Sequence, residues 1–344
     1  MGTTLSERKK QILRTVVVSY IKTAEPVGSR TVVRSQRMGL SSATIRNEMA
    51  DLEDMGYLVQ PHTSAGRIPS QLGYRYYVDN LMALDDMSGD IEREISITMS
   101  REKMREIEQI IVHSARVLSS ATNQTSLIMG PQFKKSAFRQ MRILPLEEKR
   151  SLVVLITDTG FIKNKVIDLQ QQLSPSELQQ VVSYLNQKLY GLTIDQVTTS
   201  LINELKRDLF RRLEILEQAF ILLEESLKEE KQIRVFLGGT TNILNQPEFK
   251  DVDKIRRMLN LFEQEPLLFK ILEDSSSEDN IVVRIGTENE CEDIRECTLV
   301  TGTYKIHDKT IGTVGVLGPT RMDYGRVINV MRRLVDHLNE SLSS

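Results

Sequence analysis

The chain has 344 residues, of which 40% are hydrophobic and 27% charged, and its formal net charge is −2. This length allows two or three domains, and no apolar run approaches the roughly 20 residues that a membrane-spanning helix needs. The N-terminal segment MGTTLSERKKQIL lacks the apolar core of a secretory signal, and the two cysteines, Cys291 and Cys297, show no metal or redox spacing. We therefore expect a cytoplasmic globular protein.

The small net charge hides an asymmetry along the chain. Residues 1–80 contain 11 Lys or Arg against 7 Asp or Glu, whereas the remainder contains 34 against 40. A basic N-terminal part on an acidic body indicates that only the N-terminal part meets a polyanion.

Three helices are predicted at the N-terminus. The first covers 5–21, where apolar side chains repeat at helical spacing. Ser29 is a candidate N-cap of a short helix over 29–36, and Ser41 or Ser42 caps a third helix. Helix, helix, turn, helix within so few residues is the pattern of a helix-turn-helix.

The third helix has two different faces. At about 100° per residue, Ile45, Met49 and Leu52 share one face, which we expect to be buried. The opposite face is small, polar and cationic: Ala43, Arg46, Asn47 and Ala50. Alanine can rest on a thymine methyl, asparagine can pair with adenine, and arginine with guanine. A solvated amphipathic helix is the alternative, but the two preceding helices favour DNA recognition.

The segment GYLVQPHTSAGRIPSQLGYRYYVD, residues 56–79, follows this helix after a stop at Gly56. Its apolar YLVQP, its HTSAG turn and the returning RIP predict a β-hairpin, with Gly66 permitting a positive φ at the tip and Pro69 at a strand end. A Gly-rich ligand loop is the alternative. Directly after a recognition helix, however, a hairpin is the wing of a winged helix.

These elements give one predicted set of DNA contacts: Ser29, Arg30, Ser41, Ser42, Ala43, Thr44, Arg46, Asn47, His62, Thr63, Ser64 and Arg67. Hydroxyls at helix N-termini meet phosphates, and the wing, through Arg67, would contact phosphates or the minor groove. His62 has no second histidine nearby to suggest a metal. The acidic residues between Glu48 and Asp54 would keep the far end of the helix off the DNA.

The rest of the chain mixes strands and helices. Residues 83–104 are charged and predict a linker, while strand patterns occupy about 139–169 and 281–318 with a mostly helical block between them. This arrangement predicts one sheet domain with an insertion. Gly238 and Gly239 follow a strand, and a structural turn is favoured over a phosphate cradle because the Lys-Ser/Thr pair of a P-loop is missing.

A helix of about 35 residues is predicted over 196–231, with apolar residues at nearly heptad spacing. The central positions of this seam, which we expect to pair with a second copy of the chain, are Leu205, Leu209, Leu213, Leu216, Phe220 and Leu223. An ordinary core helix would show the same pattern, so both interpretations stay open.

Several long stretches resemble the HrcA family of bacterial heat-inducible transcription repressors. They are EPVGSRTV, GLSSATIRNEMADLEDMGYL and PHTSAGRIPSQLGYRYYVD near the N-terminus, and GGTTNILNQPEF, ECTLVTGTY and TVGVLGPTRMDYGRVI near the C-terminus. The resemblance covers essentially the whole chain. It departs at Ala24, where the family has Gly before Glu-Pro, and at Gly238-Gly239, where Glu-Gly is usual.

The resemblance implies a multidomain α+β protein. Its parts would be a winged-helix DNA-binding domain (1–82), a linker (83–104), a GAF-like α/β domain in two segments (105–160 and 251–344) and a mostly helical inserted dimerisation domain (161–250). It further implies a dimer that binds the CIRCE inverted repeat upstream of chaperone operons and depends on the GroE chaperonin.

Three functions were compared. A dimeric repressor that binds double-stranded DNA is favoured, and a winged-helix regulator with a small metabolite in the GAF-like domain is the alternative. An enzyme is least favoured, because the four histidines and two cysteines form no catalytic pattern. We therefore expect no cofactor, no metal, no catalytic residue and no membrane partner.

Overall fold

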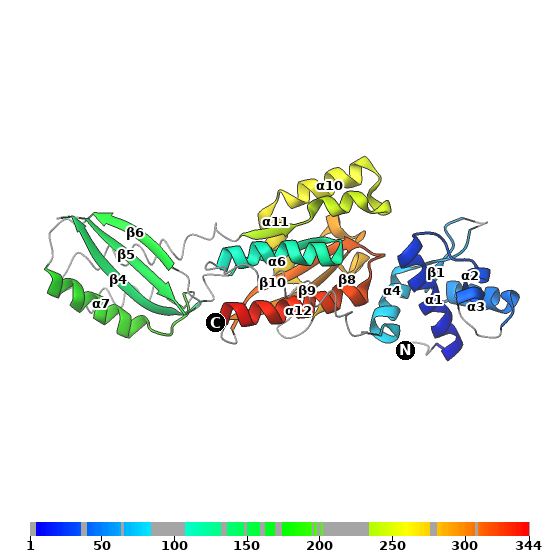
Figure 1. Cartoon of the computed structure of the whole chain (residues 1–344), viewed down its shortest axis with the longest axis horizontal. Helices are drawn as coiled ribbons and strands as arrows, with labels where there is room; N and C mark the ends of the chain where they lie inside the picture. The colour runs from blue at the N-terminus through cyan, green and yellow to red at the C-terminus, as the bar shows by residue number, and fades with distance from the viewer. Residues whose placement is uncertain are drawn as a thin grey trace. The chain divides into compact units, whose positions relative to one another are not determined.

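A computed structural model provides the structure of the chain (Figure 1). It describes residues 5–35, 40–62, 65–83, 107–131, 136–147, 150–158, 162–168, 174–194, 196–197, 201, 234–275, 281–306 and 309–343. Two compact units are present, one made of Met1–Met129, Val235–Tyr304 and Thr313–Ser344, the other of Gly130–Arg234 and Lys305–Gly312. Among the described residues, no helix is long and apolar enough to cross a membrane.

The N-terminal part is a helix-turn-helix followed by a hairpin and a further helix. Its elements are α1 (Glu7–Thr23), α2 (Ser29–Ser35), α3 (Ser42–Asp54), β1 (Leu58–Val59), β2 (Ile68–Pro69), α4 (Gln71–Tyr76) and the π-helical turn η1 (Tyr77–Leu81). Ser41 caps α3 as predicted, because its Oγ accepts a hydrogen bond from the Thr44 N–H at 3.1 Å. Ser29 is instead the first helical residue of α2.

The helices of this part share an apolar core. The inward faces of α1 and α3 carry seven side chains that are each at most 2% exposed: Ile12, Leu13, Val16, Val17, Ile45, Met49 and Leu52. α1 ends at Ala24, whose φ of 57° is left-handed. That conformation costs an L-residue roughly 1–2 kcal/mol, a cost that glycine would avoid.

The wing is short and is pinned to the turn between α1 and α2. Its strands pair antiparallel, and Arg67 also exchanges two 2.9 Å backbone hydrogen bonds with Val27. The expectation of a positive φ at Gly66 is wrong. This glycine is needed for a different reason: a Cβ there would lie 2.4 Å from the carbonyl carbon of Val27.

The sheet domain of the first unit has five strands in the order β7-β3-β10-β9-β8. Its strands are β3 (Thr125–Met129), β7 (Val235–Gly238), β8 (Val282–Ile285), β9 (Cys297–Ile306) and β10 (Lys309–Pro319). Its helices are α6 (Ile107–Thr122), α10 (Val252–Phe262), α11 (Glu265–Asp274) and α12 (Tyr324–Ser343). Short 3-10 turns join them: η4 (Thr240–Asn245), η5 (Pro247–Phe249), η6 (Gly286–Glu288) and η7 (Glu292–Ile294).

Helices cover both faces of this sheet (Figure 1). α12 packs through Met331 and Val335 against Gly302, whereas α11 packs through Leu272 against Gly315 on the other face. α6 runs so close to β7 that a Cβ at Gly238 would lie 2.3 Å from a carbonyl oxygen of α6. The Gly238-Gly239 pair is therefore required by close helix–strand packing, in agreement with a structural turn.

The second unit contains a three-stranded antiparallel sheet of its own. It consists of β4 (Phe138–Glu147), β5 (Arg150–Thr157) and β6 (Ile162–Asp168), in that order, with α7 (Pro175–Leu189). The Asn186 side chain of α7 holds both backbone groups of Met141 on β4, at 2.7 and 3.1 Å. The long seam that includes Leu205, Leu209, Leu213, Leu216, Phe220 and Leu223 lies outside the described residues.

These findings correct the expected domain boundaries. The strands between 139 and 169 do not join the sheet that contains 281–318, and the insertion includes a sheet as well as helix. β3 and β7, which flank the insertion, complete the larger sheet instead. Strand patterns show where strands are but not which partner each takes, since β4, β5 and β6 pair locally through short connections.

The close approach at Gly66 predicts a stability effect. Gly66→Ala should lower the free energy of unfolding by about 1–3 kcal/mol, because the new methyl group overlaps backbone atoms that cannot move aside alone. Thermal unfolding followed by circular dichroism measures the change. Gly325→Ala is the matched control, since a Cβ there meets its nearest atoms at 3.8 Å; equal melting temperatures for both variants would contradict the prediction.

Candidate nucleic-acid interface

The acidic residues of α3 fix this helix to α1. Lys9 Nζ lies 2.7 Å from Glu48 Oε2 and 2.8 Å from Asp51 Oδ2, and Arg8 Nη1 lies 3.3 Å from Glu48 Oε1. Hydrogen bonds to Asp51 and to Glu48 raise the pKa of Lys9, so its ammonium group stays charged. The carboxylates were expected only to keep the far end of α3 off DNA, and the structure gives them a fixing role.

The opposite face of α3 is open to solvent. Ala43, Arg46 and Asn47 are exposed, as the helical spacing predicts, while Ala50 is half-buried. No described residue bonds to the side chains of Arg46 or Asn47. A guanidinium, a carboxamide and a methyl group thus lie side by side on a helix whose other face is fully packed, an arrangement that suits contacts to base edges in a major groove.

The N-termini of α2 and α3 lie together beside this face. Ser29 Oγ and Ser42 Oγ are 2.9 Å apart, and Ser41 Oγ is 3.0 Å from Thr44 Oγ1. Arg30, next to Ser29, is exposed. The N–H groups of the first turn of α3 carry partial positive charge, so this corner favours a phosphate oxygen.

The wing closes against the end of the recognition helix. Arg67 Nε donates to Glu53 Oε2 at 2.8 Å and Arg67 Nη2 lies 2.6 Å from the same oxygen, and the Arg67 side chain is only 16% exposed. The guanidinium therefore faces α3, whereas the sequence predicted a phosphate contact. We revise its role to holding the wing against the helix.

Other wing residues lie further out. Gln60 Nε2 donates to the Ala65 carbonyl at 2.9 Å, which closes the loop across its base. His62 is exposed. Thr63 and Ser64, the remaining predicted contacts, lie outside the described residues.

Two residues that shape the interface were missed from sequence. Val27 supplies the backbone pairing for the wing, and Glu53 supplies the partner of Arg67. Val27 and Glu53 are both distant from Arg67 in the chain, so local helix and strand patterns do not connect them to it. For Glu53 and Arg67, only the opposite charges pointed to a pair. The geometry nonetheless brings together the outward face, both helix N-termini and the wing.

One hollow of the sheet domain bears on the alternative of a bound metabolite. It has a volume of about 250 Å³, lies between α11 and the turns η6 and η7, and has Lys270, Asp274, Arg284 and Glu290 among its lining residues. Arg284 already donates to the Asp274 carbonyl at 2.6 Å. Among the described residues, no group of His, Cys, Asp and Glu could hold a metal ion.

Comparison with known proteins shows the family of the chain. Residues 108–328 match the family model described as HrcA protein C terminal domain. The chain is 46% identical over 338 residues to the heat-inducible transcription repressor HrcA of Natranaerobius thermophilus, covering 98% of this chain and 97% of the relative. The chain belongs to the HrcA family. The chain is also 42% identical over 336 residues to the heat-inducible transcription repressor HrcA of Symbiobacterium thermophilum, covering 98% of both chains.

The fold also has a counterpart among solved structures. A crystal structure of a hypothetical protein, determined at 2.2 Å, matches with a TM-score of 0.65 and 26% identity, covering 99% of each chain. The match spans the winged helix as well as the HrcA C-terminal domain. The mixed α+β, multidomain class expected from the sequence is thus confirmed.

The Arg67–Glu53 pair predicts an unusual salt response. Arg67→Ala should leave the slope of log Kd against log salt unchanged for a DNA half-site, because the guanidinium is used inside the domain. A cation that contacts a phosphate would lower that slope by about one on removal. Fluorescence anisotropy across a salt series measures it, with Arg30→Ala as the comparison at an exposed cation. If Arg67→Ala lowered the slope by about one, the guanidinium of Arg67 would contact a phosphate, as the sequence predicted.

Proposed function

We propose that this chain is a heat-inducible transcription repressor that binds operator DNA through its winged helix. The observation that carries the proposal is the exposed face of α3, where the side chains of Ala43, Arg46 and Asn47 are open to solvent and bond to no described residue, on a helix paired to α1 and to the wing. The relatives named as repressors over nearly the full length support it. Acting on DNA, the protein would work in the cytoplasm.

α3 would lie in the major groove with its N-terminal half against the bases. Arg46 would donate to guanine, Asn47 would pair with adenine, and Ala43 would allow close approach or meet a thymine methyl. Ser41, Ser42 and Thr44 at the helix start, with Ser29 and Arg30 on α2, would hold flanking phosphates. The exposed His62 of the wing would meet the adjacent backbone.

The operator would be an inverted repeat read by a homodimer. Two winged helices on a two-fold axis contact half-sites one or two helical turns apart, and the family resemblance points to the CIRCE element of chaperone operons. The resemblance also points to the GroE chaperonin as the partner that maintains the active repressor. Under heat, unfolded proteins would occupy the chaperonin and free the operator. Operator binding of the purified repressor with and without chaperonin tests this link.

Base recognition predicts distinct losses at two residues. Arg46→Ala and Asn47→Ala should each cost about 1–3 kcal/mol of operator binding and relax the preference for the operator over a scrambled duplex. Anisotropy titrations against both duplexes give the two affinities. Arg332→Ala, at an exposed arginine of α12, is the control and should match the parent chain. Unchanged preference in both α3 variants would rule out base contacts by this face.

Dimerisation through the apolar seam predicts a mass change. Leu216→Glu should shift the chain towards the monomer, because a charge in a heptad seam is buried against its partner at high cost. Light scattering coupled to gel filtration measures the mass. Leu244→Glu, at a leucine 50% exposed on the sheet domain, is the matched control. A Leu216→Glu variant with the parent mass would place the dimer contact elsewhere.

A further inference from the structure

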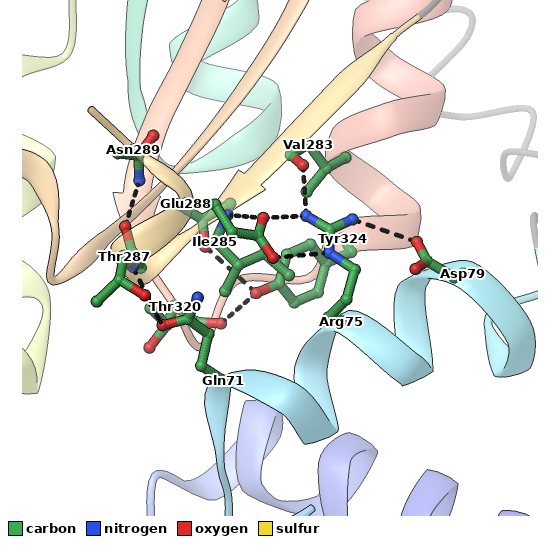
Figure 2. A network of polar contacts seen from close by, with 12 residues as sticks. Gln71, Arg75, Asp79, Val283, Ile285, Thr287, Glu288, Asn289, Thr320 and Tyr324 are labelled. Carbon is green, nitrogen blue, oxygen red and sulfur yellow. Dashed lines mark hydrogen bonds and ion pairs between the residues drawn. The ribbon is translucent and has the colours of Figure 1, made fainter. Parts of the chain in front are cut away.

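The winged helix contacts the sheet domain through α4 (Figure 2). The residues of this contact differ from those that we propose to face DNA. Arg75 Nε donates to Glu288 Oε1 at 2.9 Å, and Arg75 Nη2 donates to the second carboxylate oxygen of Glu288 and, at 2.6 Å, to the Val283 carbonyl. Glu288 in turn accepts from the Ile285 N–H at 2.8 Å. Both charged side chains are about two-thirds buried or more.

A second contact lies one helical turn away on α4. Gln71 Oε1 accepts hydrogen bonds from the backbone N–H of Thr287 at 3.1 Å and from its hydroxyl at 2.9 Å (Figure 2). Gly286, next in the chain, has a φ of 59°, and a Cβ there would lie 2.7 Å from Gln71 Oε1. The η6 turn is therefore shaped to receive this side chain closely.

The third contact comes from the segment between β10 and α12. Arg321 Nη1 donates to the Ile21 carbonyl near the end of α1 at 2.7 Å, while its Nε donates to Glu248 at 2.7 Å. Arg321 is only 12% exposed. Between these polar contacts the rings of Tyr74 and Tyr324 lie 6.0 Å apart.

Contacts made at two elements of the winged helix, α4 and the end of α1, restrict its orientation on the sheet domain. One ion pair alone would leave the winged helix free to rotate about it. Burial works to raise the pKa of Glu288, but hydrogen bonds from Arg75 and Ile285 and the charge of Arg75 outweigh it and the pKa is lowered. Its stabilising effect is thus complete above the ordinary pKa of glutamate, including at neutral pH, and is lost only as the pH falls through the lowered value.

We propose that Arg75, Gln71 and Arg321 are positioning residues that make the repressor selective for the spacing between operator half-sites. The inference rests on the proposed function, since it needs two winged helices acting on one inverted repeat. A winged helix that is fixed to its sheet domain cannot turn on that domain to follow a half-site that has been displaced or rotated. An operator with altered spacing then cannot satisfy both at once.

Operators with altered spacing test this proposal on the full-length chain. Inserting two base pairs between half-sites rotates one half-site by about 70° relative to the other, since B-DNA turns once in 10–10.5 base pairs. For the parent chain we expect Kd to rise at least about tenfold, or about 1.4 kcal/mol. For Arg75→Ala combined with Arg321→Ala, and for Gln71→Ala, we expect a smaller rise, with single half-site affinity unchanged.

Two controls separate positioning from general damage. Arg295→Ala removes an arginine of the sheet domain that pairs with Glu292, so it should keep the spacing response of the parent chain. Glu288→Gln removes the charge but keeps the shape, and should weaken spacing selectivity while single half-site affinity stays that of the parent chain.

The outcomes are distinguishable. Parent-like spacing responses in the variants, with normal half-site binding, would overturn the inference, and so would a parent chain indifferent to spacing. Loss of half-site binding in Arg75→Ala would also overturn it, because the residue would then act within the winged helix. Absence of half-site binding by the parent chain would remove the proposed function itself.

Discussion

The charge pairs of α3 are the constraint on which the position of its exposed face depends. Glu48 and Asp51 bind Lys9 of α1, and Glu53 binds Arg67 of the wing, so the acidic side chains of α3 are tied to its two neighbours. Pairs this close to the surface each contribute only about 0.2–1 kcal/mol. Their larger effect is on direction: together with the buried Ile45, Met49 and Leu52 they keep the exposed face of α3 turned outward.

Charged side chains also hold the contact between the winged helix and the sheet domain. Arg75 and Arg321 each reach a carboxylate and a backbone carbonyl, which uses the planar guanidinium as a fork. A carbonyl partner demands a defined geometry that a point charge would not. The contact between the winged helix and the sheet domain therefore restricts their relative orientation. The proposed positioning of α3 needs such a restriction.

Much of the N-terminal part followed from local rules. The buried face of α3, its Ser41 cap and the position of the wing came from helical spacing and capping chemistry, because those effects act over a few neighbouring residues. Gly66 was located correctly but for the wrong reason, since a close approach to Val27 is invisible in the sequence. At Ala24 the sequence showed a departure from the glycine that the family resemblance implies. Only the structure showed that this residue has a left-handed φ, which is unfavourable for alanine.

The sequence by itself determined the helix-turn-helix, the outward residues Ala43, Arg46 and Asn47 and the family resemblance, because periodicity, caps and motifs are local. Only the tertiary structure decided that Arg67 faces Glu53, that β3 and β7 rather than β4–β6 complete the large sheet, and that Arg75 reaches Glu288. These are pairings between residues distant in the chain. Their partners are selected by the packing of whole elements, for which a single sequence carries no period or spacing.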